Sequence, residues 1–314
     1  MGVVDILSFL QECRTRQNSI EMKSFCFNKI YVIESLPADD RQTGRELYDD
    51  LLRYESIKYP QLSVEYRSIV DKSAWDVLME EIAMDCVQNG NQVILHIEIH
   101  GAENGSGLVL ANRDYLSYDS IRPQFVRINI ATGCNSFLTL AVCKGLYVTS
   151  INRLSQPMPF CGLLGAYDKI TESDLAIRFN EFYDELFDSF ELAKAYQRLM
   201  SVNPGIPHSY RFVHADDFFC KVYQNYIDQK CNSAIIKKRA LDAAKENNFP
   251  LENRQKRRKF QREFIQLERK KRLKYYQDAA NTFFMLDRFP ENKNRFDVPS
   301  DLVELKKRAD GIRI

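Results

Sequence analysis

The stretch Asn91-Gln-Val-Ile-Leu-His-Ile-Glu-Ile-His100-Gly101 is an apolar run that ends in histidine and glycine. A second apolar run, Phe137-Leu-Thr-Leu-Ala-Val-Cys143-Lys144-Gly145, ends in cysteine 43 residues further along the chain. Each run has the length and composition of a buried strand. Neighbouring parallel strands bring their carboxyl ends to one edge of a sheet, where open α/β sheets place their functional groups. The sequence therefore predicts that His100 and Cys143 meet at such an edge, each at the end of its strand.

Segments typical of strands and helices alternate around these two runs. We expect further strands at 27–36, 62–69, 107–111, 160–166 and 210–214, and helices at 47–54, 73–88, 117–131, from 173 onwards and at 218–226. This alternation predicts a mostly parallel central sheet in a three-layer α/β fold. At 314 residues, the chain has room for one large domain and an extension.

The composition changes near Cys231, because residues 232–286 show no strand pattern. We predict an α/β domain over residues 1–231 and an all-helical C-terminal extension over residues 232–314.

The extension carries an unusually basic segment. Between Leu251 and Lys274 there are eleven Lys or Arg against three Glu, and Phe260, Phe264 and Leu267 recur there at helical spacing. Three interpretations stay open. The segment is a solvated helix face, a helix that docks on a partner protein, or a nucleic-acid contact, which is less favoured because the segment forms no known module.

Charge and cysteine usage indicate an ordinary protein of the cytoplasm. The net charge is +1, hydrophobic residues make up 45% and charged residues 28% of the chain, and no apolar run is long enough to cross a bilayer. The N-terminus lacks the basic start and apolar core of a signal peptide. Eight cysteines occur without a CxxC pair (13, 26, 86, 134, 143, 161, 220, 231). We therefore expect free thiols, a cytoplasmic location and no membrane partner.

A cysteine becomes a strong nucleophile when a histidine beside it takes its proton. His100 and Cys143 are the candidate pair, with His100 as base and Cys143 as nucleophile. Gly101 allows an incoming carbonyl to approach the backbone closely. The amides of Gly101 and Cys143 are the candidate oxyanion hole, in which each donor is worth about 3–4 kcal/mol in comparable hydrolases.

Histidine and glutamate alternate along the first run, a pattern that is also compatible with a metal-binding site. His96, Glu98 and His100 lie on one face of a strand and have the side chains of metal ligands. In a sheet covered on both faces that side lies under helices, so we favour structural roles for His96 and Glu98. His-x-Glu also opens the zinc deaminase signature, but the required Pro-Cys-x-x-Cys is absent. We expect no metal and no cofactor.

The sequence resembles the caspase-like cysteine proteases, and in particular their bacterial CHAT branch. The resemblance rests on the run from His100 to Leu110, on Leu-Ala-Val-Cys143-Lys-Gly, and on 160–166 followed by a helix with Phe179-Asn-Glu-Phe-Tyr183. It covers roughly residues 25 to 190. It implies the caspase-hemoglobinase fold and a His100–Cys143 dyad that cleaves peptide bonds through a thioester.

Two positions depart from the caspase pattern for substrate binding. Caspases carry Gln two residues before the nucleophile, where this chain has Ala141. Arg41 lies about where a caspase keeps its other specificity arginine, but its spacing to Gly44 does not match. Specificity for Asp is therefore unsupported, and a pocket for basic or apolar residues is equally compatible with the sequence.

The resemblance implies an intracellular cysteine endopeptidase that acts on a protein substrate as a regulated effector in bacterial signalling or defence. Only 16 residues separate Cys143 from Phe160, the region where caspases carry a cleavable linker. We therefore expect an activating protein partner instead of linker cleavage. The alternative is a catalytically silent caspase-fold adaptor that binds protein or nucleic acid through its basic extension.

Overall fold

The computed structural model describes residues 25–203, 205 and 208–312, which form two compact units. The described part of the α/β unit runs to Arg153 and from Pro157 to Ala215. The helical unit contains Leu154–Gln156 and the chain from Asp216 onwards. Cys13 and the N-terminal segment in which no signal peptide is expected lie outside the described residues.

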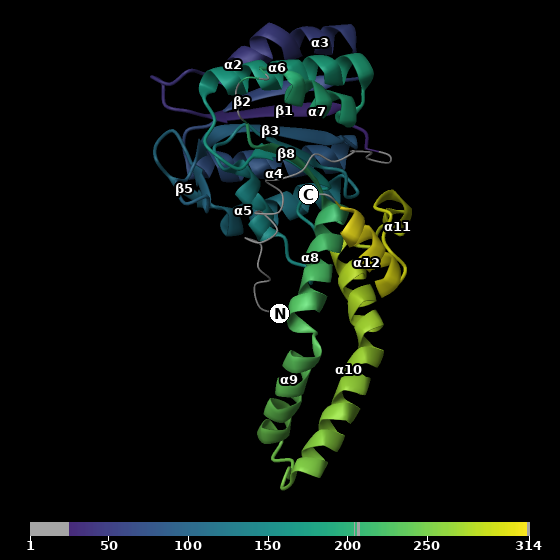
Figure 1. Ribbon diagram of the computed structural model, residues 1–314. Coiled ribbons are helices and arrows are strands. Elements are labelled where there is room, and N and C mark those ends of the chain that lie inside the picture. Colours follow the sequence, from purple (N-terminus) through teal and green to yellow (C-terminus); the bar gives the residue numbers. More distant parts are fainter. Residues whose placement is uncertain (1–24, 204, 206–207, 313–314) are drawn as a thin grey trace. The chain divides into compact units, whose positions relative to one another are not determined.

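A mostly parallel sheet forms the centre of the α/β unit (Figure 1). Six of its strands lie in the order β2-β1-β3-β6-β7-β8. Among these six, only β8 runs antiparallel to the strand beside it, β7. The bounds are β1 Lys29–Ser35, β2 Ser63–Ser68, β3 Val93–Gly101, β6 Phe137–Leu140, β7 Gly162–Ala166 and β8 Tyr210–His214. This strand order confirms the predicted mostly parallel sheet of an α/β fold.

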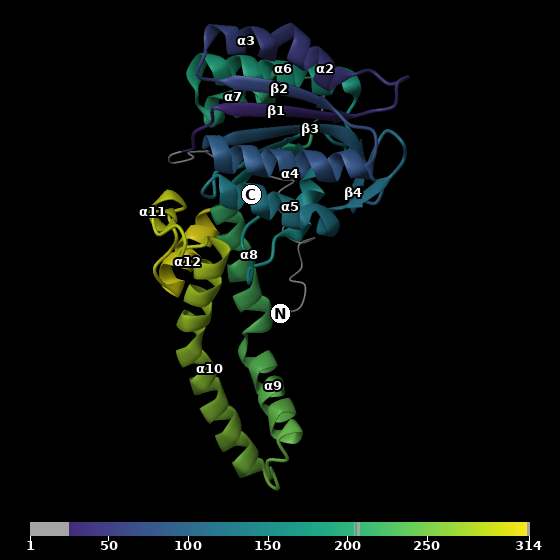
Figure 2. The same cartoon turned by 180° about the vertical axis from the view of Figure 1, so that it is seen from behind.

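Helices cover both faces of this sheet. Helices α4 and α5 lie on one face, and α2, α3, α6 and α7 lie on the other (Figures 1 and 2). Their bounds, with those of two short helices of other types, are α2 Thr43–Leu47, η1 Tyr48–Leu52, α3 Arg53–Lys58, α4 Lys72–Asn89, α5 Tyr118–Ala131, η2 Gly145–Ile151, α6 Glu172–Ser189 and α7 Leu192–Ser201. As a result, β3 is buried along nearly its whole length.

Local sequence determines where the two helices on the first face begin and how they pack. The Asp71 side chain accepts a hydrogen bond from the Ala74 amide at the start of α4, and the Ser117 side chain accepts one from the Ser120 amide at the start of α5. Trp75 packs edge-on against Phe125 with ring centroids 6.3 Å apart, so the two helices share one aromatic contact.

A short antiparallel hairpin extends the end of β3. It consists of β4 Gly107–Val109 and β5 Tyr115–Ser117, and β4 pairs with the last two residues of β3, His100 and Gly101. Strand β4 therefore lies on the side of β3 that faces away from β6, and its pairing fixes the backbone at the end of β3.

The helical unit begins earlier than the sequence predicts. It contains α8 Ala215–Lys230, α9 Ser233–Glu246, α10 Arg254–Phe283, α11 Asn292–Arg295 and α12 Leu302–Gly311. Helix α8 belongs to this unit because its aromatic face packs on α10: Phe219 lies 5.1 Å from Phe283 between ring centroids, and Tyr223 lies 5.3 Å from Tyr276. The compositional change near Cys231 marks the break between α8 and α9, and the units divide before Asp216.

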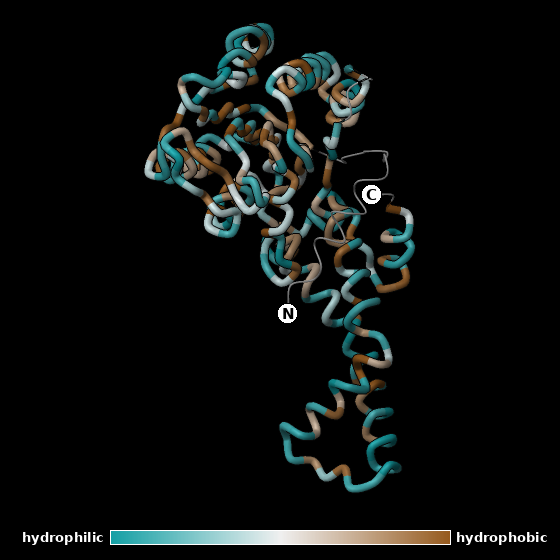
Figure 3. Tube along the Cα trace, turned by 60° about the vertical axis from the view of Figure 1, so that its left-hand side comes forward, coloured by the Kyte–Doolittle hydropathy of each residue, from teal (hydrophilic) through white to brown (hydrophobic). Residues whose placement is uncertain are grey.

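The basic segment lies on α10, where hydrophilic residues predominate (Figure 3). The three apolar residues at helical spacing in this segment are packed only in part. The Phe260 ring lies 5.0 Å from Phe249 and 6.2 Å from Phe264 between centroids, whereas Leu267 is about half exposed. Across the described residues, no helix has both the length and the apolar character required to span a membrane.

Candidate active site

The ends of β3 and β6 lie side by side, as the sequence predicts. The two strands are parallel, with Ile97 opposite Leu140, and the Ala141 amide continues the ladder by donating to the Ile97 carbonyl at 3.0 Å. Beyond this point the backbones nearly touch, because a Cβ added to Gly101 would lie 1.9 Å from the Cys143 carbonyl oxygen. The structure therefore brings His100-Gly101 and Cys143 to one edge of the sheet.

Cys143 does not end its strand, and the prediction on this point is wrong. Strand β6 stops at Leu140, and Cys143 lies in a turn before η2. In this turn the Gly145 amide donates to the Val142 carbonyl at 3.0 Å, and Lys144 adopts the left-handed conformation with φ 59°. The turn lifts the cysteine off the β6 ladder while keeping it at the edge.

The cysteine sulfur is held by the chain that follows β7. The Ile170 amide donates to Cys143 Sγ at 3.4 Å, and the Ile170 carbonyl lies 3.7 Å from the sulfur. Within the described residues no hydrogen bond joins the sulfur to the His100 ring.

The backbone amides of Gly101 and Cys143, the predicted oxyanion hole, both lie at this edge. The Ala102 amide donates to the Gly107 carbonyl, so the next pair, Gly101 and Leu108, is a non-hydrogen-bonded pair of the β3–β4 ladder. The Gly101 N–H therefore points away from β4, towards the side where Cys143 lies. The Cys143 amide has no acceptor among the residues that the structure describes.

Replacing Gly101 with alanine should damage both the edge and the fold. Its new Cβ overlaps the Cys143 carbonyl, which belongs to the backbone and has no rotamer through which to move aside. We expect a loss of about 1–3 kcal/mol in the free energy of unfolding, as in other overpacked sites, measured by urea denaturation. Gly311→Ala is the matched control, because its Cβ meets nothing within 4 Å. Equal stability of the two variants would contradict the close approach.

An aspartate that the sequence analysis did not single out orients the histidine. Asp40 lies in the loop after β1, and its Oδ2 accepts a hydrogen bond from His100 Nε2 at 2.6 Å. Because Nε2 carries the proton in this contact, Nδ1 is left with the lone pair and is the nitrogen that can act as base. The strand order explains this contact, since β1 pairs with β3 and the loops that follow these strands leave at the same edge.

His96 and Glu98 form a buried network and do not line an open site. His96 Nε2 contacts Glu98 Oε1 at 2.8 Å, His96 Nδ1 contacts the Thr139 hydroxyl at 2.9 Å, and Thr43 donates to Glu98. Tyr183 on α6 extends the network through Thr139 at 2.8 Å. Groups of three or more metal-ligating side chains do not occur within the described chain. Both side chains are buried, and their hydrogen bonds join β3 to β6 and to α2.

A second buried carboxylate neighbours this network. Glu34 on β1 accepts hydrogen bonds from the Gly44 amide at 2.8 Å and from the Tyr66 hydroxyl at 2.5 Å. Burial raises the pKa of Glu34, and the nearby Glu98 carboxylate raises it further, while the donors oppose the shift. The network ties α2 to the sheet, and the loop with Asp40 leads directly into α2.

The two residues predicted to bind substrate, Ala141 and Arg41, differ in their exposure. Ala141 is buried, so its side chain lines no open pocket. Arg41 is partly exposed and forms an ion pair with Glu46 at 2.6 Å. It lines a cavity of about 280 Å³ whose other charged residues, Glu46, Asp50 and Glu181, are acidic.

Comparison with known proteins adds no assignment to this geometry. No protein-family model matches the chain, and a search of curated proteins finds no match. The candidate site therefore rests on the positions of its own residues: a histidine oriented by Asp40, a cysteine in the adjacent turn, and two backbone amides between them.

Proposed function

We propose that the α/β unit is a caspase-like cysteine endopeptidase in which Cys143 is the nucleophile and His100 the base. The observation that carries this proposal is the contact between Gly101 and the Cys143 backbone at the edge of the sheet. The mostly parallel sheet with helices on both faces supports the fold class that the resemblance implies. A role as a regulated effector with an activating protein partner belongs to the same proposal.

The proposed reaction uses these groups in two stages. His100 Nδ1 takes the thiol proton as Cys143 Sγ attacks the substrate carbonyl, and the amides of Gly101 and Cys143 bind the resulting oxyanion. The same proton passes to the leaving amine when the C–N bond breaks, which leaves a thioester on Cys143. His100 then takes a proton from water, which attacks the thioester, and the proton returns to the thiolate as the acid is released.

Asp40 acts through His100 in this proposal, so its loss should reduce activity without abolishing it. Asp40→Ala removes the acceptor that fixes the His100 tautomer. We expect kcat/KM for cleavage of an unfolded protein to fall by at least about tenfold. The loss should stay below the roughly 10⁴-fold effect known for a serine protease triad, because His100 is solvent-exposed here. The fall should lie mainly in kcat, because Asp40 contacts the base and does not act on substrate binding in this proposal.

The neighbouring Asp39 provides the matched control, because it is exposed in the same loop and has no recorded contact with His100. Asp39→Ala should retain the kcat and the KM of the unmodified protein. If Asp40→Ala behaves like Asp39→Ala in both measurements, the orienting role of Asp40 is wrong.

A catalytically silent adaptor is the second candidate, favoured by one observation. The Cys143 sulfur is hydrogen-bonded to the Ile170 backbone and not to the imidazole. An adaptor should bind its partner through the basic surface of α10 and should be unaffected by the loss of the thiol. Substrate cleavage that depends on Cys143 separates the endopeptidase from this alternative.

A further inference from the structure

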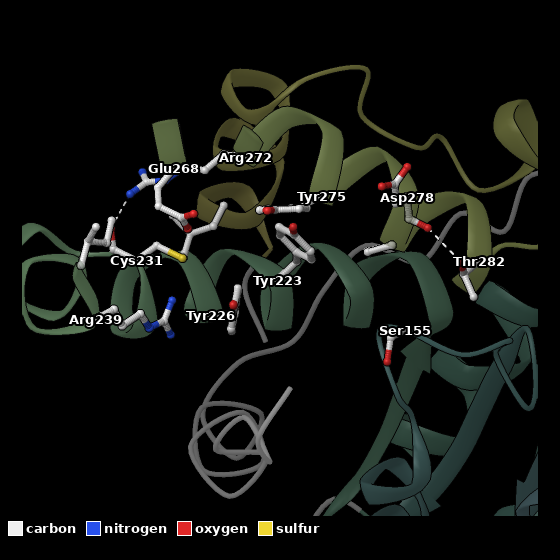
Figure 4. A pocket seen from close by; sticks show the side chains of 13 residues that line it. Ser155, Tyr223, Tyr226, Cys231, Arg239, Glu268, Arg272, Tyr275, Asp278 and Thr282 are labelled. Carbon is white, nitrogen blue, oxygen red and sulfur yellow. Dashed lines mark hydrogen bonds between the residues drawn. The ribbon is translucent and has the colours of Figure 1, made fainter. Parts of the chain in front are cut away.

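The helical unit contains a cavity that the proposed protease chemistry does not use. It has a volume of about 360 Å³ and lies between α10 and the break that separates α8 from α9 (Figure 4). This volume is within the range of small-molecule sites, which are mostly apolar and contain a few convergent polar groups.

The break between α8 and α9 explains why a cavity forms there. Helix α8 ends at Lys230, and Asn232 caps the start of α9 by accepting a hydrogen bond from the Ile235 amide. Helix α10 continues without interruption opposite this point. Arg272 on α10 reaches across and donates from Nη2 to the Cys231 carbonyl at 2.5 Å, which satisfies an acceptor at the end of α8.

Aromatic rings make up much of the cavity wall. Tyr223 and Tyr226 project from α8, and Tyr275 projects from α10 on the opposite side (Figure 4). Tyr223 is buried, whereas Tyr275 is about half exposed at the rim. Three rings on two facing helices suit a planar aromatic group, which gains from stacked or edge-on contacts as well as from burial.

Four charged residues line the same cavity: Arg239 on α9, and Glu268, Arg272 and Asp278 on α10. Glu268 and Arg272 lie one turn apart on α10, in the order that favours an ion pair on a helix, and both are half-buried. Within the described residues they form no ion pair, and Arg272 Nε is buried with no hydrogen-bond acceptor. A guanidinium and a carboxylate held side by side in this way present complementary charges to a ligand.

We propose that this cavity binds a free aromatic L-amino acid as a zwitterion. The ligand carboxylate accepts hydrogen bonds from Arg272, its ammonium group donates to Glu268, and its ring lies among Tyr223, Tyr226 and Tyr275. A simple anion leaves Glu268 without a partner, and a simple cation leaves Arg272 Nε without one. A ligand that carries both charges gives Glu268 and Arg272 a partner at the same time.

Calorimetry on the full chain tests this proposal with L-tryptophan as the probe. Two analogues each lack one charge: tryptamine has no carboxylate, and 3-indolepropionate has no ammonium group. We expect L-tryptophan to bind with a Kd below about 1 mM and each analogue to bind at least about tenfold more weakly. In Arg272→Gln, L-tryptophan and tryptamine should bind equally, and in Glu268→Gln, L-tryptophan and 3-indolepropionate should bind equally.

Arg258→Gln and Glu263→Gln are the matched controls, because both side chains are exposed on α10 and do not line the cavity. Both should bind L-tryptophan as the unmodified protein does. Arg272→Gln also removes the contact with Cys231, so Glu268→Gln and the analogues test recognition independently of that contact. Absence of L-tryptophan binding at about 10 mM, or equal binding of all three compounds, overturns the proposal.

Discussion

Replacing Cys143 with alanine should reduce peptide-bond cleavage to the background rate. In the proposed reaction, every covalent step passes through the sulfur, and neither His100 nor the two amides can form the thioester alone. Loss of a protease nucleophile lowers kcat on the order of 10⁶-fold in a well-studied serine protease. The measurement is the rate at which new peptide termini appear in an unfolded protein substrate, followed by mass spectrometry.

His100→Ala should reduce the same rate by a comparable factor, because the two residues act as one unit and their effects do not add. Cys26→Ala is the matched control, since Cys26 is an exposed free cysteine of the same unit. Cleavage that survives in Cys143→Ala and is independent of His100 would rule out the dyad.

Glu98→Ala should cause the largest loss of stability among the substitutions considered. The substitution leaves His96 Nε2 and the Thr43 hydroxyl buried without their shared acceptor. Each buried group left without its hydrogen-bond partner costs about 1–3 kcal/mol. Urea denaturation measures the change, and a chelator should leave the stability of the unmodified protein as it is, because the role of Glu98 in this account is structural.

A double-mutant cycle with His96→Ala tests the coupling directly. The two substitutions together should cost less than the sum of the single losses, by about 0.5–3 kcal/mol. Glu80→Ala is the surface control, because its ion pair with Arg127 is solvent-exposed and should contribute at most about 1 kcal/mol. Additive losses at positions 96 and 98 would show that the buried network is not cooperative.

The arrangement of the sheet could be predicted from the sequence because its strands are buried on both faces. Such strands appear as continuous apolar runs, and the run that ends in His100 became the central strand β3. The parallel arrangement then required the ends of β3 and β6 to meet at one edge, and the Gly101–Cys143 contact follows from it.

Other parts of the site depend on tertiary contacts that a local pattern does not contain. The apolar residues Ala141 and Val142 predict that β6 continues to Cys143, but contacts of Lys144 with the chain after β7 favour a turn instead. Asp40 is one of two adjacent aspartates in a polar loop, and only the fold shows which of them contacts His100. The neighbouring Arg41 was predicted to bind substrate, but its guanidinium forms an ion pair with Glu46.

The helical unit shows how one sequence signal can have two meanings. The change near Cys231 was interpreted as a domain boundary, because the strand pattern ends there. In the structure it marks a helix break, with Asn232 as the cap of α9. Helix α8 lies before this break, and the aromatic side chains along one of its sides pack on α10.

The reactivity of Cys143 towards iodoacetamide near pH 6.5 is the most direct test of the dyad, because only the thiolate reacts. Peptide mass spectrometry can follow Cys143 and Cys26 in the same sample, and Cys26 is the more exposed of the two. We predict that Cys143 is alkylated at least about tenfold faster than Cys26 and that His100→Ala removes this advantage. Alkylation of Cys143 no faster than Cys26, with or without His100, would contradict the thiolate–imidazole pair.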